Sequence, residues 1–283
     1  FSINIYILKT TVIIMGYNLE RINNNKDILF KHYDTMSDLI DKMIFIWNNL
    51  EKPMPDINMK NVELVKIKAE KNSLCNRHYI VYDYLKTDSA LIIDEDITLS
   101  RKTIKNLIEK WNENKDCVIG LRKRSYDKSG QYYGDLVEEE RVHKNNTILT
   151  IGQTMMYHKK YMKDFEKLND LHHYIDKIDP AISEDLGFQL MVHSINKKPS
   201  TIVINGEIKD LSSVGSISAS YSSQKRNVDR SNAIRHFLKY FKKMRIQQSK
   251  INYHYFKLSA TLISFFIIIF FITIKFYRLK YTQ

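Results

Sequence analysis

A run of three acidic residues, Asp94-Glu95-Asp96, follows directly on the apolar residues 90–93. A short apolar run that ends abruptly in charge is typical of a buried strand whose carboxyl end opens toward solvent. In open α/β sheets that end of the strand is where ligands bind. Three crowded carboxylates repel one another, so a bound cation would stabilise them. The spacing is equally compatible with a solvated acidic turn that merely ends a strand.

The segments around this triplet predict the frame that would position it. Short β-rich apolar segments predict buried strands, and between them Ser100 suits the N-cap of a helix. Such alternation predicts an α/β fold with a mainly parallel sheet covered on both sides by helices. The polar stretch 122–144 is either a long loop over the site or a small excursion from the sheet. The predicted strands cover residues 10–15, 43–47, 62–67, 91–93, 118–121, 147–151 and 201–204.

Two helices are predicted in the second half of the chain. The first covers residues 183–195, with Ser183 as its cap and Glu184-Asp185 in its first turn. The second follows a serine- and glycine-rich segment, 211–223, that suits a mobile loop. Arg226 and Arg230 lie one turn apart near the start of this second helix.

Composition bounds the class of protein. The 283 residues are 43% hydrophobic, which allows one large α/β domain or two small ones with a sizeable core. The formal net charge of +12 indicates an anionic partner, such as nucleotide phosphates, nucleic acid or a membrane surface. No nucleic-acid motif is present, so nucleic acid is disfavoured. Cys75 and Cys117 belong to no Cys/His cluster, which disfavours structural zinc.

A membrane span is predicted near the end of the chain. Residues 258–274 carry no charge and are dominated by Ile, Phe and Leu, and tyrosines flank both ends. Six Lys and Arg lie in the twenty residues before this segment and three lie after it, a bias that favours a cytosolic catalytic side. The chain begins with Phe1, so we expect the true N-terminus to lie upstream.

Polar motifs at the predicted strand ends and helix starts follow one another in a characteristic order. They are Tyr17-Asn18, Asn48-Asn49, Asn72, Asn76-Arg77, Asp94-Glu95-Asp96, Arg124, Ile151-Gly152, Glu184-Asp185 and Arg230-Ser231. From about residue 11 to about residue 241 this order and spacing resemble the exostosin-like glycosyltransferases. That family of α-N-acetylhexosaminyltransferases includes the C-terminal catalytic domain of the exostosins.

The resemblance implies a nucleotide-diphospho-sugar transferase fold of the GT-A-like type. It also implies a metal-dependent retaining glycosyltransferase that moves N-acetylhexosamine, with N-acetylglucosamine favoured, from a UDP-sugar to a glycan or glycolipid. A single-pass protein of the endoplasmic reticulum or Golgi membrane is expected. Because carboxylates and phosphates offer only oxygen ligands, manganese or magnesium is favoured over zinc.

Site roles follow from the same resemblance. Asp96 would bind the metal directly, while Asp94 and Glu95 would contact the ribose or sugar, or bind the metal through water. Asp185 would be the catalytic carboxylate beside the anomeric carbon, although a first-turn acid favoured by the helix dipole is the simpler reading of the residue itself. The remaining donor-binding residues would be Asn48, Asn49, Asn72, Asn76 and Arg77 for uracil, ribose and sugar, and Arg226 and Arg230 for the diphosphate.

This chain departs from the family pattern at two places. Met15 and Leu19 stand where relatives have Gln and Arg, and Met15 cannot hydrogen-bond a base. Ser183 and Ala233 replace a disulfide-forming cysteine pair, which is compatible with a reducing compartment.

These departures motivate a second hypothesis, a catalytically silent membrane-anchored relative that binds nucleotide or glycan. A metal-dependent hydrolase using the same carboxylates is a third. The expected organisation is a glycosyltransferase domain over 9–246, with a donor-binding half of about 9–121 and an acceptor and catalytic half of about 122–246. A basic juxtamembrane linker (247–257), the transmembrane helix (258–274) and a short tail (275–283) follow.

Overall fold

The computed structural model describes residues 8–134, 146–178, 180–211 and 224–245. The chain falls into two compact units, residues 1–237 and 238–283, and the second is described only over 238–245. The predicted linker, transmembrane helix and tail therefore lie outside the described residues, as do 212–223 of the predicted mobile loop. Within the part of the chain that is described, no helix has the length and apolarity needed to span a bilayer.

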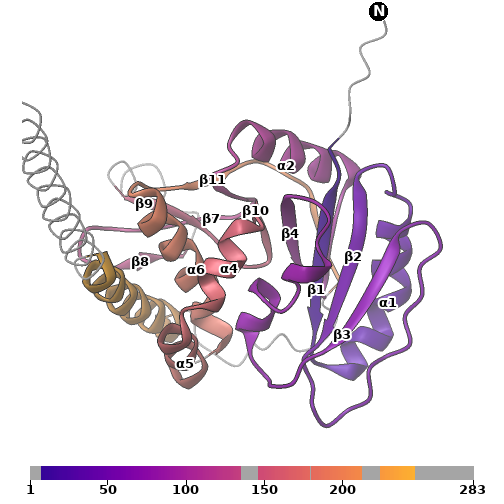
Figure 1. Ribbon diagram of the computed structural model, residues 1–283, viewed down its shortest axis with the longest axis horizontal. Coiled ribbons are helices and arrows are strands. Elements are labelled where there is room, and N and C mark those ends of the chain that lie inside the picture. Colours follow the sequence, from indigo (N-terminus) through magenta and orange to yellow (C-terminus); the bar gives the residue numbers. More distant parts are fainter. Residues whose placement is uncertain (1–7, 135–145, 179, 212–223, 246–283) are drawn as a thin grey trace, which may run out of the picture. The chain divides into compact units, whose positions relative to one another are not determined.

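A seven-stranded sheet runs through the first unit (Figure 1). Only β10 is antiparallel to its neighbours, so the sheet is mainly parallel, as the alternating sequence pattern predicted. Because β10 lies between β4 and β6, both predicted halves of the domain contribute to one sheet. In spatial order the strands are β11 (Thr201–Val203), β6 (Val118–Gly120), β10 (Thr154–His158), β4 (Ser89–Asp94), β1 (Thr10–Gly16), β2 (Ile40–Trp47) and β3 (Glu63–Lys68).

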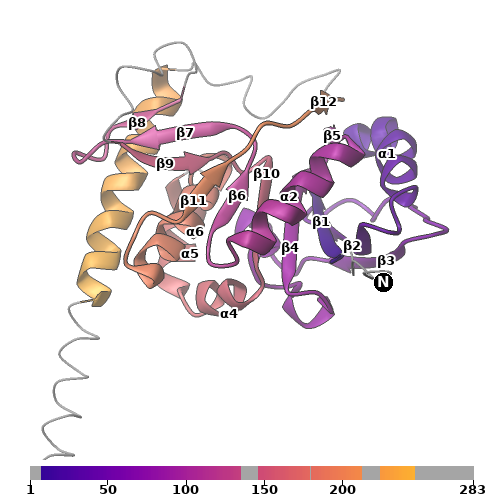
Figure 2. The same cartoon turned by 90° about the horizontal axis from the view of Figure 1, so that it is seen from above.

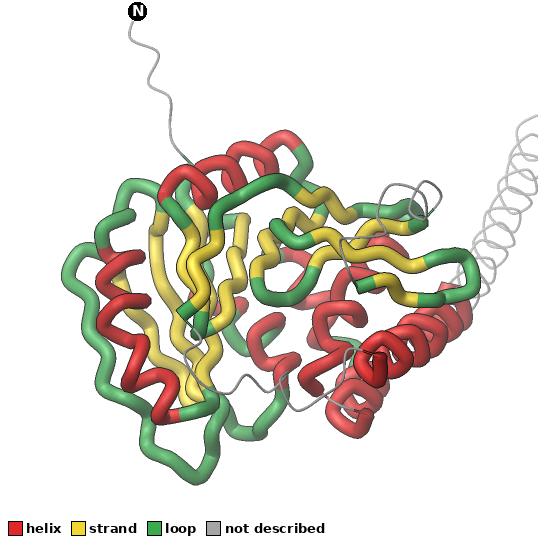
Figure 3. The backbone as a smooth tube through the Cα atoms, turned by 180° about the vertical axis from the view of Figure 1, so that it is seen from behind, coloured by secondary structure: helices red, strands yellow, loops and turns green. Residues whose placement is uncertain are grey.

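Helices cover both faces of this sheet, which explains why its central strands are apolar throughout rather than alternating. All seven residues of β1 are buried. Helices α1 (Leu19–Asp34) and α2 (Arg101–Glu113) lie in front of the strands in Figure 3. Helices α4 (Lys160–Glu166), α5 (Asn169–Ile178) and α6 (Pro180–Asn196) lie toward the viewer in Figure 1.

The helix starts were predicted with mixed success. Ser100 caps α2 as expected, since its side chain accepts a hydrogen bond from the backbone N–H of Thr103. Ser183 was wrongly expected to cap the next predicted helix. That helix, α6, begins at Pro180 instead, because proline has no N–H to lose and its fixed φ suits a first helical position. Glu184 and Asp185 consequently lie beyond the first turn.

Two small sheets flank the main one (Figure 2). Strand β5 (Ile97–Leu99), directly after the acidic triplet, pairs with β12 (Ile208–Asp210). Strand β7 (Lys123–Tyr126) pairs with β8 (Tyr132–Tyr133) and β9 (Thr147–Thr150), so the described part of the polar stretch is a small excursion from the sheet. Short 3-10 helices, η1 (Leu74–His78) and η2 (Tyr82–Tyr84), lie between β3 and β4, and a helix over 224–245 carries the two predicted arginines.

Candidate functional site

The acidic triplet lies at the carboxyl end of β4, as predicted. Asp94 is the last residue of β4 and pairs in register with Met15 of β1. The side chains of Asp94, Glu95 and Asp96 are 28%, 16% and 13% exposed. Three neighbouring carboxyl groups are therefore held largely out of water.

Their proximity carries an electrostatic cost. Burial, together with the charges of Asp94 and Asp96, raises the pKa of Glu95 to about 7. Burial and the neighbouring Asp94 also raise the pKa of Asp96. Arg21 of α1 offsets part of this repulsion, since its Nη1 lies 3.3 Å from Glu95 Oε1 and 3.6 Å from Asp96 Oδ2. Arg21 was not among the predicted site residues, because its only signal in the sequence is its place in the first turn of the helix after β1.

The triplet fits a divalent cation by its chemistry. Asp96 Oδ1 is buried and accepts no hydrogen bond, which leaves a hard anionic oxygen available as a ligand. A cation there would also relieve the repulsion that raises the two pKa values. Among the described residues, however, no three His, Cys, Asp or Glu side chains converge on a common point.

Arg77 joins this triplet to the acidic pair on α6. Its Nη1 donates to Asp94 Oδ1 at 2.8 Å, while its Nε donates to Glu184 Oε1 at 2.7 Å. Its Nη2 lies 2.5 Å from the same Glu184 oxygen. The structure thus brings together two motifs that are 90 residues apart in the sequence, positions 94 and 184.

Asp185 faces a tight turn next to this arginine. Its Oδ2 accepts a hydrogen bond from the backbone N–H of Gly152 at 2.8 Å. Burial, followed by the charge of Glu184, raises the pKa of Asp185 to about 6 against the opposing effects of Arg230 and Arg77. A side chain at Gly152 would overlap both neighbours, because an added Cβ would lie 2.6 Å from Arg77 Nη2 and 3.0 Å from Asp185 Cβ.

The two predicted arginines lie on the helix over 224–245. Arg230 Nη1 donates to the Tyr132 hydroxyl at 2.8 Å, and its guanidinium lies 5.1 Å from the centre of that ring. The charge of Arg230 also lowers the pKa of Asp185, against the effect of burial. Arg226 is partly buried one turn earlier on the same helix.

The predicted asparagines form a network of their own. Asn48 Nδ2 donates to Asn72 Oδ1 at 2.9 Å, and Asn76 Nδ2 donates to Asn48 Oδ1 at 2.7 Å. Asn48 and Asn76 are only 1% and 2% exposed, so both act in holding the loops that follow β2 and β3. Asn49 donates to the Tyr17 carbonyl at 3.0 Å and accepts from the backbone N–H of Lys52 at 3.0 Å. Of these four asparagines, Asn72 is the most open to solvent.

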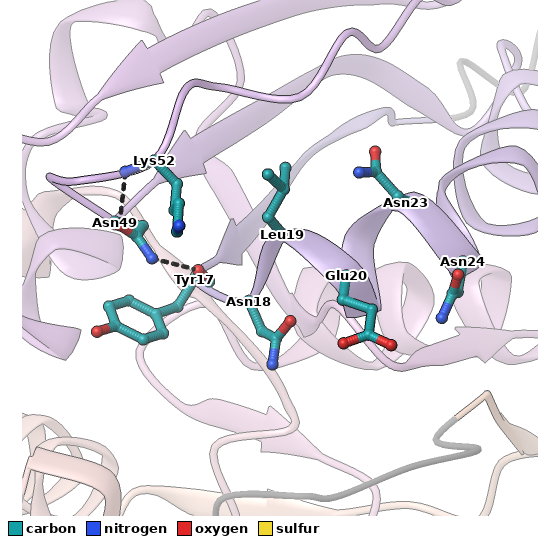
Figure 4. Close-up of a pocket in the computed structure, with 8 residues that line it drawn as sticks. All are labelled: Tyr17, Asn18, Leu19, Glu20, Asn23, Asn24, Asn49 and Lys52. Carbon is teal, nitrogen blue, oxygen red and sulfur yellow. Dashed lines mark hydrogen bonds between the residues drawn. The ribbon is translucent and has the colours of Figure 1, made fainter.

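A pocket of about 540 Å³ lies between the start of α1 and the loop after β2 (Figure 4). Its position at the ends of β1 and β2 puts it next to the triplet, because β1 also pairs with β4. Asn23 and Asn24 are exposed at its edge. Its lining consists of Tyr17, Asn18, Leu19, Glu20, Asn23, Asn24, Asn49 and Lys52.

Curated relatives carry the exostosin name. The exostosin-like-3 homolog of Caenorhabditis elegans is 24% identical over 163 residues, which cover 56% of this chain and 19% of the relative. Human exostosin-2 is 25% identical over 56% of this chain and 22% of its own length. Human exostosin-like 2 is 25% identical over 51% of this chain and 47% of its own. The chain therefore spans about a fifth of the length of the first two relatives and about half of the third.

Solved structures align more loosely. HddC from Yersinia pseudotuberculosis aligns with a TM-score of 0.42 and 13% identity, covering 71% of this chain and 92% of that one. GalNAc-T7 with UDP, GalNAc and Mn²⁺ aligns with a TM-score of 0.46 and 9% identity, covering 73% of this chain and 45% of that one.

One family model covers most of the sequence. The glycosyl transferase family 64 domain matches residues 10–257, which include every site residue discussed above. This match and the exostosin-like relatives confirm the resemblance drawn from the polar motifs. The chain belongs to glycosyl transferase family 64, a family of exostosin-like glycosyltransferases.

Proposed function

We propose that this protein is a metal-dependent retaining glycosyltransferase that transfers N-acetylhexosamine, with N-acetylglucosamine favoured, from a UDP-sugar to a glycan or glycolipid. One observation carries the proposal: Arg77 links the acidic triplet at Asp94 to the Glu184-Asp185 pair. A nucleotide-sugar needs a cation site for its diphosphate and a carboxylate near its anomeric carbon, and this arrangement offers both within reach of one substrate.

The roles of the residues follow from their chemistry. A bound Mn²⁺ or Mg²⁺ would neutralise the charge that develops on the leaving nucleoside diphosphate. Asp96 would hold that ion through Oδ1, with Asp94 assisting directly or through water. Arg230 and Arg226 would face the diphosphate as fixed cations. Asp185, ionised, would stabilise the oxocarbenium-like anomeric carbon or attack it.

The base and sugar would bind beside the triplet. The pocket at the start of α1 is open and combines asparagine side chains with apolar surface, which suits the nucleoside. Glu95 and Asn72 are suited to contact the ribose or sugar. Since Asn48, Asn49 and Asn76 already hydrogen-bond within the protein, we propose that they shape this pocket more than they read the base.

A panel of nucleotide sugars tests the proposal. We expect Mn²⁺-dependent transfer or hydrolysis of UDP-N-acetylglucosamine by the full chain. Asp96→Asn and Asp185→Asn should each lower turnover by at least about 100-fold, because each removes a charge that stabilises the transition state. Asp83→Asn, at an exposed acid outside the site, is the matched control and should remain active. Failure to bind UDP with any metal would refute the enzyme and its metal site together.

A catalytically silent relative is the second candidate. Met15 and Leu19 stand where the base would be read, and the nearby asparagines are already engaged. UDP binding without turnover of any donor, in a protein that unfolds cooperatively, would favour this candidate.

Membrane attachment is a separate proposal. We propose that residues 258–274 anchor the protein in the endoplasmic reticulum or Golgi membrane, as their apolar composition and tyrosine flanks support. Retention in the pellet after alkaline carbonate extraction is the expected result, and release into the supernatant would refute it.

A further inference from the structure

A buried histidine follows Arg77 in the sequence and has no part in the proposed binding of the donor or the cation. His78 is fully buried on η1, under the site. Its ring stacks on Phe188 of α6, with centroids 4.3 Å apart, and meets Phe165 edge-on. Both ring nitrogens are nevertheless engaged: Nε2 lies 2.9 Å from Glu184 Oε1, and Nδ1 lies 3.0 Å from the Tyr157 hydroxyl.

The partners determine which nitrogen carries the proton. Burial lowers the pKa of His78, so the ring is neutral and carries one N–H. Burial would raise the pKa of Glu184, but the charge of Arg77 and the hydrogen bond from His78 outweigh it and hold the carboxylate ionised. An ionised carboxylate only accepts hydrogen bonds. Nε2–H therefore donates to Glu184, and Nδ1 accepts from the hydroxyl of Tyr157.

One oxygen of Glu184 thus accepts hydrogen bonds from His78 and from Arg77 at once. A buried carboxylate held by several donors is rigid, because releasing any of them leaves charge or a donor unsatisfied. Glu184 in turn fixes the guanidinium of Arg77 and precedes Asp185 on α6. The position of His78 therefore affects the orientation of Arg77, which contacts Asp94, and of Asp185, which follows Glu184.

We propose that His78 is a positioning residue which, supported by Tyr157, orients Glu184 and through it Arg77 and Asp185 for glycosyl transfer. The expected effect on turnover rests on the proposed function, whereas the expected effect on the stability of the protein does not. The hydrogen bond from Nε2–H to Glu184 is required for this orientation, and a side chain that only fills the space of the ring cannot replace it.

Two amide variants isolate that donor. In His78→Gln the amide nitrogen reaches about the place of Nε2, whereas the shorter side chain of His78→Asn ends near Nδ1. Both variants lose a titrating ring and bury an amide. They differ by one methylene and in the partner that the amide can reach, which is Glu184 for Gln and Tyr157 for Asn. In the full-length protein with UDP-N-acetylglucosamine and Mn²⁺, we expect His78→Asn to lower kcat about 10-fold or more while KM changes less than about 3-fold. His78→Gln should retain kcat within about 3-fold of the wild type.

A buried histidine elsewhere controls for packing. His172 is 4% exposed and also packs against Phe165, and burial likewise lowers its pKa, to about 4. His172→Asn should leave kcat within about 3-fold of the wild type. Equal losses in His78→Gln and His78→Asn, or a similar loss in His172→Asn, would overturn the proposal in an enzyme that is active.

Thermal unfolding tests the proposal even if the wild type turns over no donor. The folded-state pKa of Glu184 is depressed, so the stability it contributes is present above its ordinary pKa and lost as pH falls through the folded value. The Tm of His78→Gln should therefore exceed that of His78→Asn at pH 7, and this gap should narrow only as pH falls below the ordinary glutamate pKa of 4.5. A gap that is absent or independent of pH would refute the positioning role by itself.

Discussion

At the scale of single residues, the site is defined by carboxyl groups whose ionised form is destabilised by burial. Glu95, Asp96 and Asp185 all have raised pKa values, and burial is the first cause in each case. Perturbed acids gathered at one place are typical of functional sites. Arg21 and Arg77 supply the compensating charge, one on each side of the triplet.

The sequence motifs identified most of these residues but not their partners. Asp94-Glu95-Asp96 and Glu184-Asp185 were found because consecutive acids next to apolar runs are visible in a sequence. Arg21 and His78 were not predicted, because their carboxylate partners are distant in the sequence. Arg21 contacts Glu95, 74 residues away, and His78 contacts Glu184, 106 residues away. Asn48 and Asn76 could be seen but not interpreted, because burial decides whether an amide binds a ligand or the protein.

The pH dependence of the reaction follows from Asp185. Its pKa is about 6 and the proposed role requires the ionised form. We expect kcat/KM for the UDP-sugar to be level above pH 7 and to fall about tenfold per pH unit well below pH 6. A rate profile from pH 4.5 to 8.5 at saturating Mn²⁺ measures this limb. A limb near pH 4, where an ordinary aspartate titrates, would contradict the assignment.

Gly152 provides a steric test of the same carboxylate. Gly152→Ala would push its Cβ against Arg77 and Asp185, so we expect kcat/KM to fall about 10-fold or more. Gly206→Ala is the matched control, because its Cβ would meet Thr103 Cγ2 at the same distance, 2.6 Å, away from the site. Both should lower the Tm, and comparable losses of activity in the two variants would show that the effect is not local.

At the scale of elements, alternation of apolar segments predicted the strands well. Strands β1, β2, β4 and β6 coincide with predicted segments, because a strand buried on both faces has few alternatives. The edge strand β3 also coincides with one, although its residues are exposed or only partly buried. Strand β10 was not predicted, although it lies between β4 and β6 and reverses the local direction of the sheet. Sequence pattern reports that a segment is buried, but its partner and direction depend on the whole sheet.

Asp34 offers a test of how an element is tied into this frame. It lies at the end of α1 and accepts backbone N–H groups of Lys60, Asn61 and Val62, just before β3. Burial would raise the pKa of Asp34, but these three hydrogen bonds have the larger effect, so its pKa is lowered. Asp34→Ala should lower the free energy of unfolding by about 1–2 kcal/mol at pH 7, discounted for partial solvent exposure.

The sign of the pH effect follows from that lowered pKa. The stability from Asp34 is present above the ordinary aspartate pKa and is lost as pH falls through the folded value. Urea unfolding at pH 7 and pH 3.5 should therefore show a smaller deficit at the lower pH. Asp38 is an exposed acid whose ion pair in the described part of the chain is with Arg101. Asp38→Ala should therefore lower the free energy of unfolding by less than half as much as Asp34→Ala.

At the scale of the whole molecule, the charge and the apolar segment near its end combine into one expectation about membranes. Residues 239–257 are rich in Lys and Arg, and the span that follows is uncharged. Basic residues next to a span favour the cytosolic side, so the catalytic domain is expected to face the cytosol.

Two lysines in the span test the anchor itself. Ile267→Lys with Ile268→Lys places two charges near the middle of 258–274, each costing about 2.5–3.5 kcal/mol at a helix centre. We expect the variant to leave the carbonate-resistant pellet, while two lysines at Ile251 and Tyr253, before the span, should not change the partition.

The sequon Asn145-Asn146-Thr147 reports the orientation of the protein in the membrane. With the catalytic domain in the cytosol, Asn145 stays unglycosylated, and a glycosidase-sensitive shift lost in Asn145→Gln would reverse the expected topology.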